Sequence, residues 1–340
     1  MFKLNDNESM LLELENKIID MPYTSNANLM SIKKWANCVK EIECDALSLS
    51  VTKNGVTYAI CKFFVIKNSG RIHLVSGGRF GFSGVFIINE DITINHIVDL
   101  LIDYCKNKKI STLSVFINTP NISYSTTNFD LKIKEIVYLM ASVKESCDEN
   151  GLSFRNAKKR SNLSRSLKSA KEKPFSVGVI GKNGNMQILN EWYLTCHKKR
   201  IEEISGREWE EEIFADLISN GTGNLVYVYN AIDKKILGGC FILNSETILE
   251  LFMMSTPRAN QEEGVNFLLT EYLYKYAFMN NNKFVNWQSS NPPVGPLVNY
   301  KKSWNANEYK HLLINYKLDQ SFSFNDQYIG FRDFFIFPYE

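Results

Sequence analysis

The stretch from Thr247 to Gln288 constrains the fold of this 340-residue chain more than any other part. A short apolar run at 247–254 is followed by a polar segment, by apolar residues at helical spacing and by a second apolar run at 284–288. The helical positions are Phe267, Leu268, Tyr272, Leu273, Tyr276 and Ala277. This pattern predicts a strand, a loop, a helix over 263–281 and a second strand, and a helical crossover of this kind joins two parallel strands. The stretch therefore predicts a mixed α/β (α+β) architecture.

The polar segment between the first strand and the helix has the most chemical interest. The first turn of a helix presents N–H groups without intrahelical partners at the positive end of the helix dipole. A phosphate binds well there, and Gly264 would let the backbone approach it closely. The alternative is an ordinary strand-to-helix turn, because the segment contains neither a GxGxxG nor a GxxxxGK[ST] motif.

The first half of the chain gives weaker signals. Helices are predicted over 7–20 and 26–41, and Asn54-Gly55 between two apolar runs predicts a β-hairpin. A strand at 71–76, a helix at 92–107, a strand at 111–118 and a strand-like segment at 132–142 follow. Their order resembles that of the second half, which indicates duplication, and the polar segment 144–151 is the predicted boundary.

The order of elements in the second half resembles the fold of the GNAT acyltransferases. Helices are predicted at 188–205 and 208–219 and strands at 224–231 and 236–244, ahead of the stretch described first. The segment RANQEEGVN (258–266) stands where that family carries its Q/R-x-x-G-x-G/A loop for the pyrophosphate of acyl-coenzyme A. Arg258, Gln261 and Gly264 fit that loop, whereas Asn266 replaces its last small residue.

Two further segments narrow the resemblance to the FemAB-like branch of this superfamily. QSSNPPVGPLVNYKKSW (288–304) is similar to that branch's segment after the last strand, with Ser289 in a turn followed by Tyr300-Lys301 and by Trp304. A basic helix over 155–172 is similar to the one that opens the branch's second half. The branch is built as two GNAT-like modules in tandem, each a mixed twisted sheet flanked by helices. The resemblance implies an acceptor-side module over 1–150 and an acyl-coenzyme A module over 151–340.

Acyl transfer to an amine needs a base, a leaving-group acid and a fixed donor. Glu250 lies in the strand before the predicted phosphate loop and is the candidate base, with His197 as an alternative. The resemblance implies a helix tyrosine that protonates the leaving thiolate, and Tyr272 is the candidate. For each of these residues, ordinary packing is the competing interpretation.

The binding residues are implied by the same resemblance. In GNAT enzymes the end of the strand before the loop separates from its neighbour, and its backbone pairs with the pantetheine arm; Met253, Met254 and Ser255 would supply those groups. Arg79, in the glycine-rich segment 77–87, is a candidate for a phosphate of the acceptor, and the alternative is that this segment only connects strands. Arg160 belongs to the basic helix, which would bind the diphosphate of a nucleotide sugar or of coenzyme A, would bind RNA, or is a solvated helix face. The remaining candidates for acceptor binding are Ser289, Lys301 and Trp304, with Lys301 directed at a phosphate or at the reacting carbonyl.

Composition excludes several classes of protein. The net charge of +2 gives no general argument for nucleic acid or an acidic membrane surface. Seven scattered cysteines without a CxxC pair are typical of reduced thiols in a cytoplasmic protein, so we expect neither disulfides nor a metal site. The amino-terminal segment lacks the apolar core of a signal peptide, and no apolar run reaches the ~20 residues that span a bilayer.

Three functions remain. The first is an acyltransferase that moves an acetyl or hydroxyacyl group from acyl-coenzyme A to an amino sugar on a dTDP- or UDP-nucleotide, for polysaccharide biosynthesis. The second is a FemAB-type transfer of an aminoacyl group from tRNA to a peptidoglycan precursor, which the mild charge disfavours. The third is a binding protein that kept the fold without the chemistry. A homodimer is compatible with all three.

Overall fold

The computed structural model describes residues 2–5, 43–68, 70–78, 81–82, 84–124, 131–149, 151–153, 157–204, 210–244, 247–289, 295–319 and 321. Internal contacts divide the chain into two units, Met1–Val137 with Tyr309–Glu340, and Tyr138–Glu308. Strands β9 (Leu131–Ser142) and β17 (Asn307–Lys317) each have residues in both units. This division differs from the boundary predicted near residue 150, and it assigns 309–340 to the first unit, not to the second.

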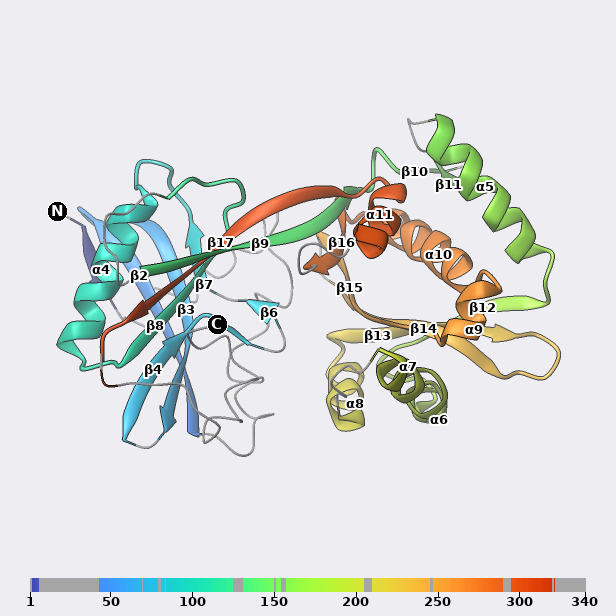
Figure 1. Ribbon diagram of the computed structural model, residues 1–340, viewed down its shortest axis with the longest axis horizontal. Coiled ribbons are helices and arrows are strands. Elements are labelled where there is room, and N and C mark those ends of the chain that lie inside the picture. Colours follow the sequence, from blue (N-terminus) through green and yellow to red (C-terminus); the bar gives the residue numbers. More distant parts are fainter. Residues whose placement is uncertain are drawn as a thin grey trace. The chain divides into compact units, whose positions relative to one another are not determined.

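The first unit contains a mixed sheet in the order β1-β2-β3-β4-β8-β17-β9, with β7 paired to β3 and β8 (Figure 1). Its further strands are β1 (Lys3–Asn5), β2 (Glu43–Lys53), β3 (Val56–Asn68), β4 (Arg71–Val75), β7 (Gly84–Ile87) and β8 (Thr112–Ile117), and β5 (Gly77–Gly78) pairs with β6 (Gly81–Phe82). The helix α4 (Ile94–Asn107) covers one face of this sheet with a stripe of apolar residues that includes Ile97, Val98 and Leu101.

Local chemistry accounts for the best predicted parts of this unit. Asn54 and Gly55 have φ of 52° and 78°, so they form the predicted hairpin turn between β2 and β3. The side chain of Thr93 accepts a hydrogen bond from the backbone N–H of His96, 3.4 Å away, and caps the predicted helix α4. The helices predicted over 7–20 and 26–41 lie outside the described residues.

The second unit contains a sheet in the order β9-β16-β15-β14-β13-β12 (Figure 1). Its further strands are β10 (Cys147–Asp148), β11 (Gly151–Leu152), β12 (Phe175–Ile180), β13 (Gly223–Asn230), β14 (Ile236–Asn244), β15 (Ile248–Ser255) and β16 (Phe284–Ser289). Its helices are α5 (Ala157–Lys171), α6 (Met186–Trp192), the π-helix η1 (Tyr193–His197), α7 (Lys198–Glu203), α8 (Glu211–Ser219), α9 (Arg258–Glu262), α10 (Val265–Met279) and α11 (Gly295–Ser303).

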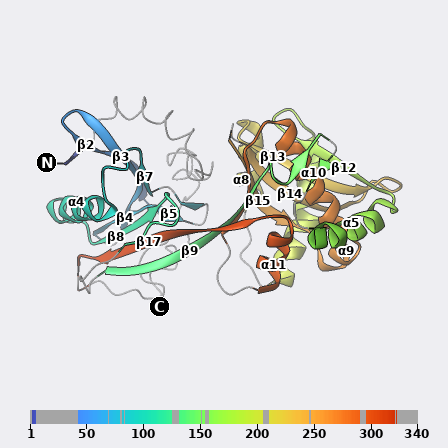
Figure 2. The same ribbon diagram turned by 90° about the horizontal axis from the view of Figure 1, so that it is seen from above.

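Helices cover both faces of this second sheet. On one face, α10 packs its buried residues against the sheet, with α5 beside it (Figure 2). On the other face lie α6, η1, α7 and α8, and the ring of Phe214 on α8 packs 4.9 Å from that of Phe241 on β14. The predicted parallel pairing is confirmed, because β15 and β16 run parallel on either side of the α10 crossover.

One local prediction in this unit is wrong. The segment predicted as a loop after β15 contains the short helix α9, which Pro257 can precede because the first helical residues need no N–H partner there. The helix predicted over 188–205 is confirmed as a continuous helical run of α6, the π-helical turn η1 and α7. No helix among the described residues is both long and apolar enough to cross a membrane.

Candidate functional site

The central feature of the second unit is a fork between β15 and β16. The two strands pair only from Ile248 to Glu250, opposite Phe284 to Asn286. Beyond that point β15 continues along β14, and its register shifts between Phe241 and Ile242, which inserts an extra residue into β15. Separation of these two strands is what the GNAT resemblance implies.

Three polar side chains meet at the vertex of this fork, where the strands stop pairing. Glu250 is fully buried and its carboxylate accepts a hydrogen bond from Nε2 of Gln288. The backbone N–H of Gln288 donates to Oδ1 of Asn286 at 2.9 Å. Gln288 has a φ of 64°, which is uncommon for a residue with a side chain, so its backbone bends to make both contacts. We call Glu250, Asn286 and Gln288 the vertex cluster.

A lysine ammonium lies one residue beyond the vertex. Lys301 on α11 donates from Nζ to the backbone carbonyl of Trp287 at 2.7 Å. Only 7% of Lys301 is exposed, and burial lowers the pKa of its ammonium to about 8. A buried carboxylate and a buried ammonium are therefore fixed at adjacent positions of one strand pair, which is the kind of charge placement that marks functional sites.

Aromatic residues hold the strand that carries these groups. The indole of Trp287 donates to Oη of Tyr274 at 3.1 Å, and that hydroxyl donates to the carbonyl of Trp304 at 2.5 Å. Trp304 is fully buried between the rings of Tyr274 and Tyr300, so its packing favours a core role over the predicted substrate contact. Tyr274 is thus the tyrosine of α10 that reaches β16.

The predicted leaving-group acid, Tyr272, lies on another side of α10. Its ring centroid is 6.4 Å from that of Tyr276, whose hydroxyl accepts a hydrogen bond from Asn224 on β13 at 3.3 Å. Burial raises the pKa of Tyr272. Tyr272 therefore lies beside Tyr276, which contacts β13. The role of Tyr272 as the leaving-group acid stays a prediction.

His197 and Ser255 are brought together by the structure. His197 Nδ1 and Ser255 Oγ are 3.0 Å apart, and both residues are buried. The ring of His197 is enclosed by Trp192, Tyr193 and Phe214 at centroid distances of 5.4–5.5 Å. This aromatic enclosure and the contact with Ser255 favour a packing role for His197, and its role as a base stays a prediction.

The predicted pyrophosphate loop is occupied by the protein's own groups. The backbone N–H of Arg258 donates to both carboxylate oxygens of Glu203, at 2.9 and 3.1 Å, so a carboxylate already lies at the start of α9. The side chain of Gln261 donates to the carbonyl of Thr256 at 2.6 Å. Two of the candidate phosphate ligands are thus engaged in the structure of the loop itself.

Gly264 has a packing role in this fold. It begins α10 with a φ of 90°, and a Cβ added there would lie 3.0 Å from the Cβ of Ala170 on α5. A glycine is therefore needed both for the backbone conformation and for the close approach of α5. Asn266, in the first turn of α10, has a buried side-chain Oδ1 for which the described residues supply no hydrogen-bond partner.

Several predicted residues are only partly placed. Met253 and Met254 lie on β15 beyond the vertex, where their backbone partners on β14 are Phe241 and Cys240. The side chains of Arg160 on α5 and Ser289 on β16 lie outside the described residues, as does the whole of Arg79.

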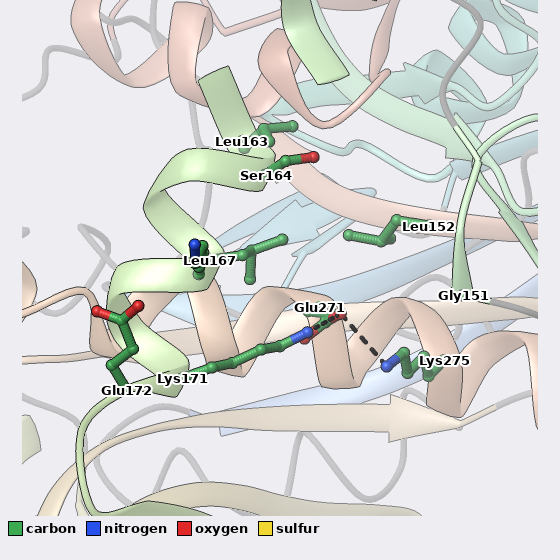
Figure 3. Close-up of a pocket in the computed structure, with 10 residues that line it drawn as sticks. Gly151, Leu152, Leu163, Ser164, Leu167, Lys171, Glu172, Glu271 and Lys275 are labelled. Atoms are coloured by element: carbon green, nitrogen blue, oxygen red, sulfur yellow. Dashed lines mark hydrogen bonds and ion pairs between the residues drawn. The ribbon is translucent and has the colours of Figure 1, made fainter. Parts of the chain in front are cut away.

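The basic helix α5 forms one wall of a groove of about 510 Å³ with α10 (Figure 3). Figure 3 shows Lys171 and Lys275 directed toward Glu271, and their Nζ atoms lie 2.8 and 3.3 Å from its Oε1. Lys168 and Glu172 contribute the other charged groups of the lining. Because the two glutamates offset most of the lysine charge, the groove has only a small excess of positive charge. Among the residues that the structure describes, no three or more His, Cys, Asp or Glu side chains are placed to hold a metal ion.

Sequence reasoning missed Asn286 and Gln288. Both are polar residues two apart in a strand that otherwise reads as apolar, and Glu250 interrupts the preceding apolar strand in the same way. Polar residues at such spacing point to the same face of a sheet. That signal could have indicated a buried polar cluster, although the pairing of the two strands decides that the residues meet.

Comparisons with known proteins support the architecture. No family model matches the sequence, and no curated protein matches it. Among solved structures, FemX is similar over 94% of this chain and 98% of its own, with 12% identity and a TM-score of 0.60. A tandem GNAT protein from the clavulanic acid biosynthesis pathway is similar over 93% of this chain and 98% of its own, with 8% identity and a TM-score of 0.55. L-PGS from Bacillus licheniformis is similar over 81% of this chain and 85% of its own, with 12% identity and a TM-score of 0.52.

These similarities concern the fold. They confirm the predicted mixed α/β, tandem GNAT-like architecture over nearly the whole length of the chain. At 8–12% identity they do not extend to a reaction or a substrate, because one fold hosts many functions.

Proposed function

We propose that this protein is an N-acyltransferase that moves an activated acyl group to an amine at the fork between β15 and β16. The observation that supports it is the presence of two buried ionisable groups near the vertex: the carboxylate of Glu250 on β15, and the ammonium of Lys301, which donates to the carbonyl of Trp287 on β16. Burying a charge is expensive, and a protein keeps such groups where chemistry needs them.

The proposed reaction uses the two charges in different roles. The acceptor amine attacks the acyl carbon, and Glu250 takes the proton that the amine loses as the new C–N bond forms. The ammonium of Lys301 stabilises the negative charge that develops on the carbonyl oxygen. The C–S or C–O bond to the leaving group then breaks, and the proton held by Glu250 passes to the leaving atom. The edge of β15 from Met253 to Ser255 would bind the donor through backbone hydrogen bonds.

For the substrates, we propose acyl-coenzyme A as donor and a dTDP- or UDP-linked amino sugar as acceptor, in the cytoplasm. The support is the sequence resemblance around Arg258, Gln261 and Gly264 and the basic residues of α5. A diphosphate bound at the start of α9 would have to displace Glu203 from the backbone of Arg258, whereas one bound at the start of α10 would not meet this carboxylate there.

A second donor has a specific observation in its favour. Glu203 accepts the backbone N–H of Arg258, the side chain of Gln261 bonds to Thr256 within the predicted pyrophosphate loop, and Gly264 packs against Ala170. This arrangement favours a donor that lacks the coenzyme A diphosphate. An aminoacyl-tRNA is such a donor, and its activated ester would lie at the same fork.

The donor classes are distinguished by one set of assays. Purified protein is incubated with acetyl- and hydroxyacyl-coenzyme A and with aminoacyl-tRNAs, each with a panel of nucleotide-linked amino sugars and peptidoglycan precursors. Release of free thiol with an amino sugar supports the first assignment, and deacylation of tRNA that depends on the acceptor supports the second. Binding of either donor without turnover, in any combination, would indicate a binding protein and refute the proposed function.

A further inference from the structure

The vertex cluster contains a polar group that the described residues do not satisfy. Asn286 is 1% exposed, and its Nδ2 has no hydrogen-bond partner in the part of the chain that the structure describes. The orientation of the amide is fixed, because the backbone N–H of Gln288 requires Oδ1 as its acceptor at 2.9 Å. The group left over is therefore a donor, buried at the point where the two strands begin to separate.

This donor lies beside an acceptor. Glu250 and Asn286 are register partners in a parallel strand pair, so their side chains point to the same face of the sheet. The carboxylate of Glu250 is itself oriented by Nε2 of Gln288. A fixed donor and a fixed carboxylate at one register position form a site for a group that can accept one hydrogen bond and donate another.

A hydroxyl is the simplest group with both capacities. It can accept a hydrogen from Nδ2 of Asn286 and donate its own hydrogen to the carboxylate of Glu250. The rest of the donor would bind along the edge of β15 from Met253 to Ser255, where β15 no longer pairs with β16. The acyl chain would then be the part of the donor that reaches the vertex. A buried amide without its partner is destabilising, and a bound hydroxyl would complete this one.

We propose that the vertex cluster is a specificity subsite for an acyl group that carries a hydroxyl, with Asn286 as the substrate-binding donor and Gln288 as the residue that positions both partners. This inference rests on the proposed acyl transfer and adds the class of acyl group. It applies to either donor class, since hydroxyacyl-coenzyme A and seryl-tRNA both present such a hydroxyl.

The test compares donors that differ by one hydroxyl. The pairs are 3-hydroxybutyryl- and butyryl-coenzyme A, and seryl- and alanyl-tRNA, with kcat/KM measured for each. We expect wild type to favour the hydroxylated member of the pair that it uses by about tenfold or more, since a lost hydrogen bond to a buried group costs on the order of 1–3 kcal/mol. The substitution Asn286→Leu should reduce this ratio to within about threefold, whatever its effect on the rate with the plain acyl group.

A matched control comes from the other unit. Asn315 on β17 is also a buried strand asparagine, 6% exposed, with an unpaired side-chain oxygen, so Asn315→Leu tests the general effect of such a change. We expect Asn315→Leu to keep the hydroxyl preference of wild type. Equal rates for both members of the pair in wild type, or a preference that survives Asn286→Leu, would overturn the inference while the acyl transfer stands.

Loss of the proposed function has a different signature. If no donor turns over with any acceptor, the acyltransferase assignment fails, and the subsite is then judged by affinity. Calorimetric Kd values for the same pairs, measured on wild type and Asn286→Leu, decide the question. A hydroxyl preference of about tenfold that disappears in the variant supports the subsite, and equal affinities, or no binding of either member, overturn it.

Discussion

Lys301 provides the sharpest test of the fork, because its burial predicts a pH-dependent stability. Its pKa of about 8 lies below the 10.5 of an unperturbed lysine, and desolvation is the cause. A shift of this size corresponds to about 3 kcal/mol of free energy of unfolding at pH 7. Burial of the charged ammonium destabilises the folded state by this amount, and Lys301→Met removes this destabilisation.

The sign of the pH dependence follows from the two pKa values. Between about pH 8 and 10.5 the unfolded chain binds more protons at this lysine than the folded chain, so the contribution of Lys301 to stability rises with pH. The full penalty is present below about pH 8. Raising the pH from 7 to 9.5 should therefore relieve about 2 kcal/mol of it in wild type and none in Lys301→Met.

The assay is urea unfolding of wild type, Lys301→Met and Lys302→Met at pH 7 and 9.5. Lys302 is the matched control, since it lies next to Lys301 on α11 but forms a half-exposed ion pair with Glu308 at 2.8 Å. Lys301→Met also loses the hydrogen bond to the carbonyl of Trp287, and this loss lowers its free energy of unfolding equally at both pH values. The free energy of unfolding of wild type minus that of Lys301→Met should therefore change between pH 7 and 9.5 only because Lys301 titrates. If the free energy of unfolding of wild type minus that of Lys301→Met is the same at pH 7 and 9.5 to within about 0.5 kcal/mol, a buried ammonium at Lys301 is refuted.

The same lysine should shape the pH profile of the reaction. If the ammonium of Lys301 stabilises the oxyanion, kcat/KM of wild type should fall as the pH rises through about 8. Lys301→Arg, which stays charged, should shift this fall to higher pH, and Lys301→Met should lose on the order of 100-fold in kcat/KM. A wild-type profile that stays flat to pH 9.5 would remove Lys301 from the chemistry.

The remaining predictions test close packing in each of the two units and the role of His197. Gly264→Ala should lower the free energy of urea unfolding by more than Gly221→Ala does. Both glycines have a positive φ, but of the two only Gly264 would place an added Cβ within 3.0 Å of a neighbour, which is Ala170. Adding Ala170→Gly to Gly264→Ala should therefore recover part of the lost stability. Gly84→Ala should cost more than about 3 kcal/mol or prevent folding, because the added Cβ would clash with the backbone carbonyl oxygen of Phe116. Near-native stability by the same assay would contradict the strand pairing there. His197→Gln should keep kcat within about tenfold of wild type if the histidine is structural, and a 100-fold loss would restore it as a base.

The strand, helix and strand around the fork could be predicted because their signals are local. The apolar run of β15, the helical spacing in α10 and the apolar run of β16 each lie within a window of fewer than about twenty residues. The pairing of the two strands followed from the handedness and length of a helical crossover. Each of these predictions depends only on the sequence of the segment itself.

The function of single residues could not be predicted in the same way. Gly264 fits a pyrophosphate loop by its neighbours in sequence, but its contact is Ala170, which lies on another helix. Tyr272 and Tyr276 were placed on the buried face of α10, whereas the tyrosine that is fully buried and reaches β16 is Tyr274. A helix that packs against a sheet on one side and against α5 on another has no single apolar face, so spacing does not select among its tyrosines.

The vertex cluster shows why tertiary pairing carries the chemistry. Glu250 alone is a glutamate in an apolar strand, and its sequence context allows an edge position in water. In the fold, β15 and β16 are paired as far as Glu250 and Asn286, and the carboxylate of Glu250 is fully buried. Polar neighbours must then offset the desolvation of this carboxylate. Gln288 supplies one such neighbour at the cost of an uncommon backbone conformation, and Lys301 places a cation one residue farther along β16. A chain selected for stability alone would fill these positions with apolar residues of similar volume, so the concentration of buried polar groups at the point where two strands separate is itself the argument for a reaction there.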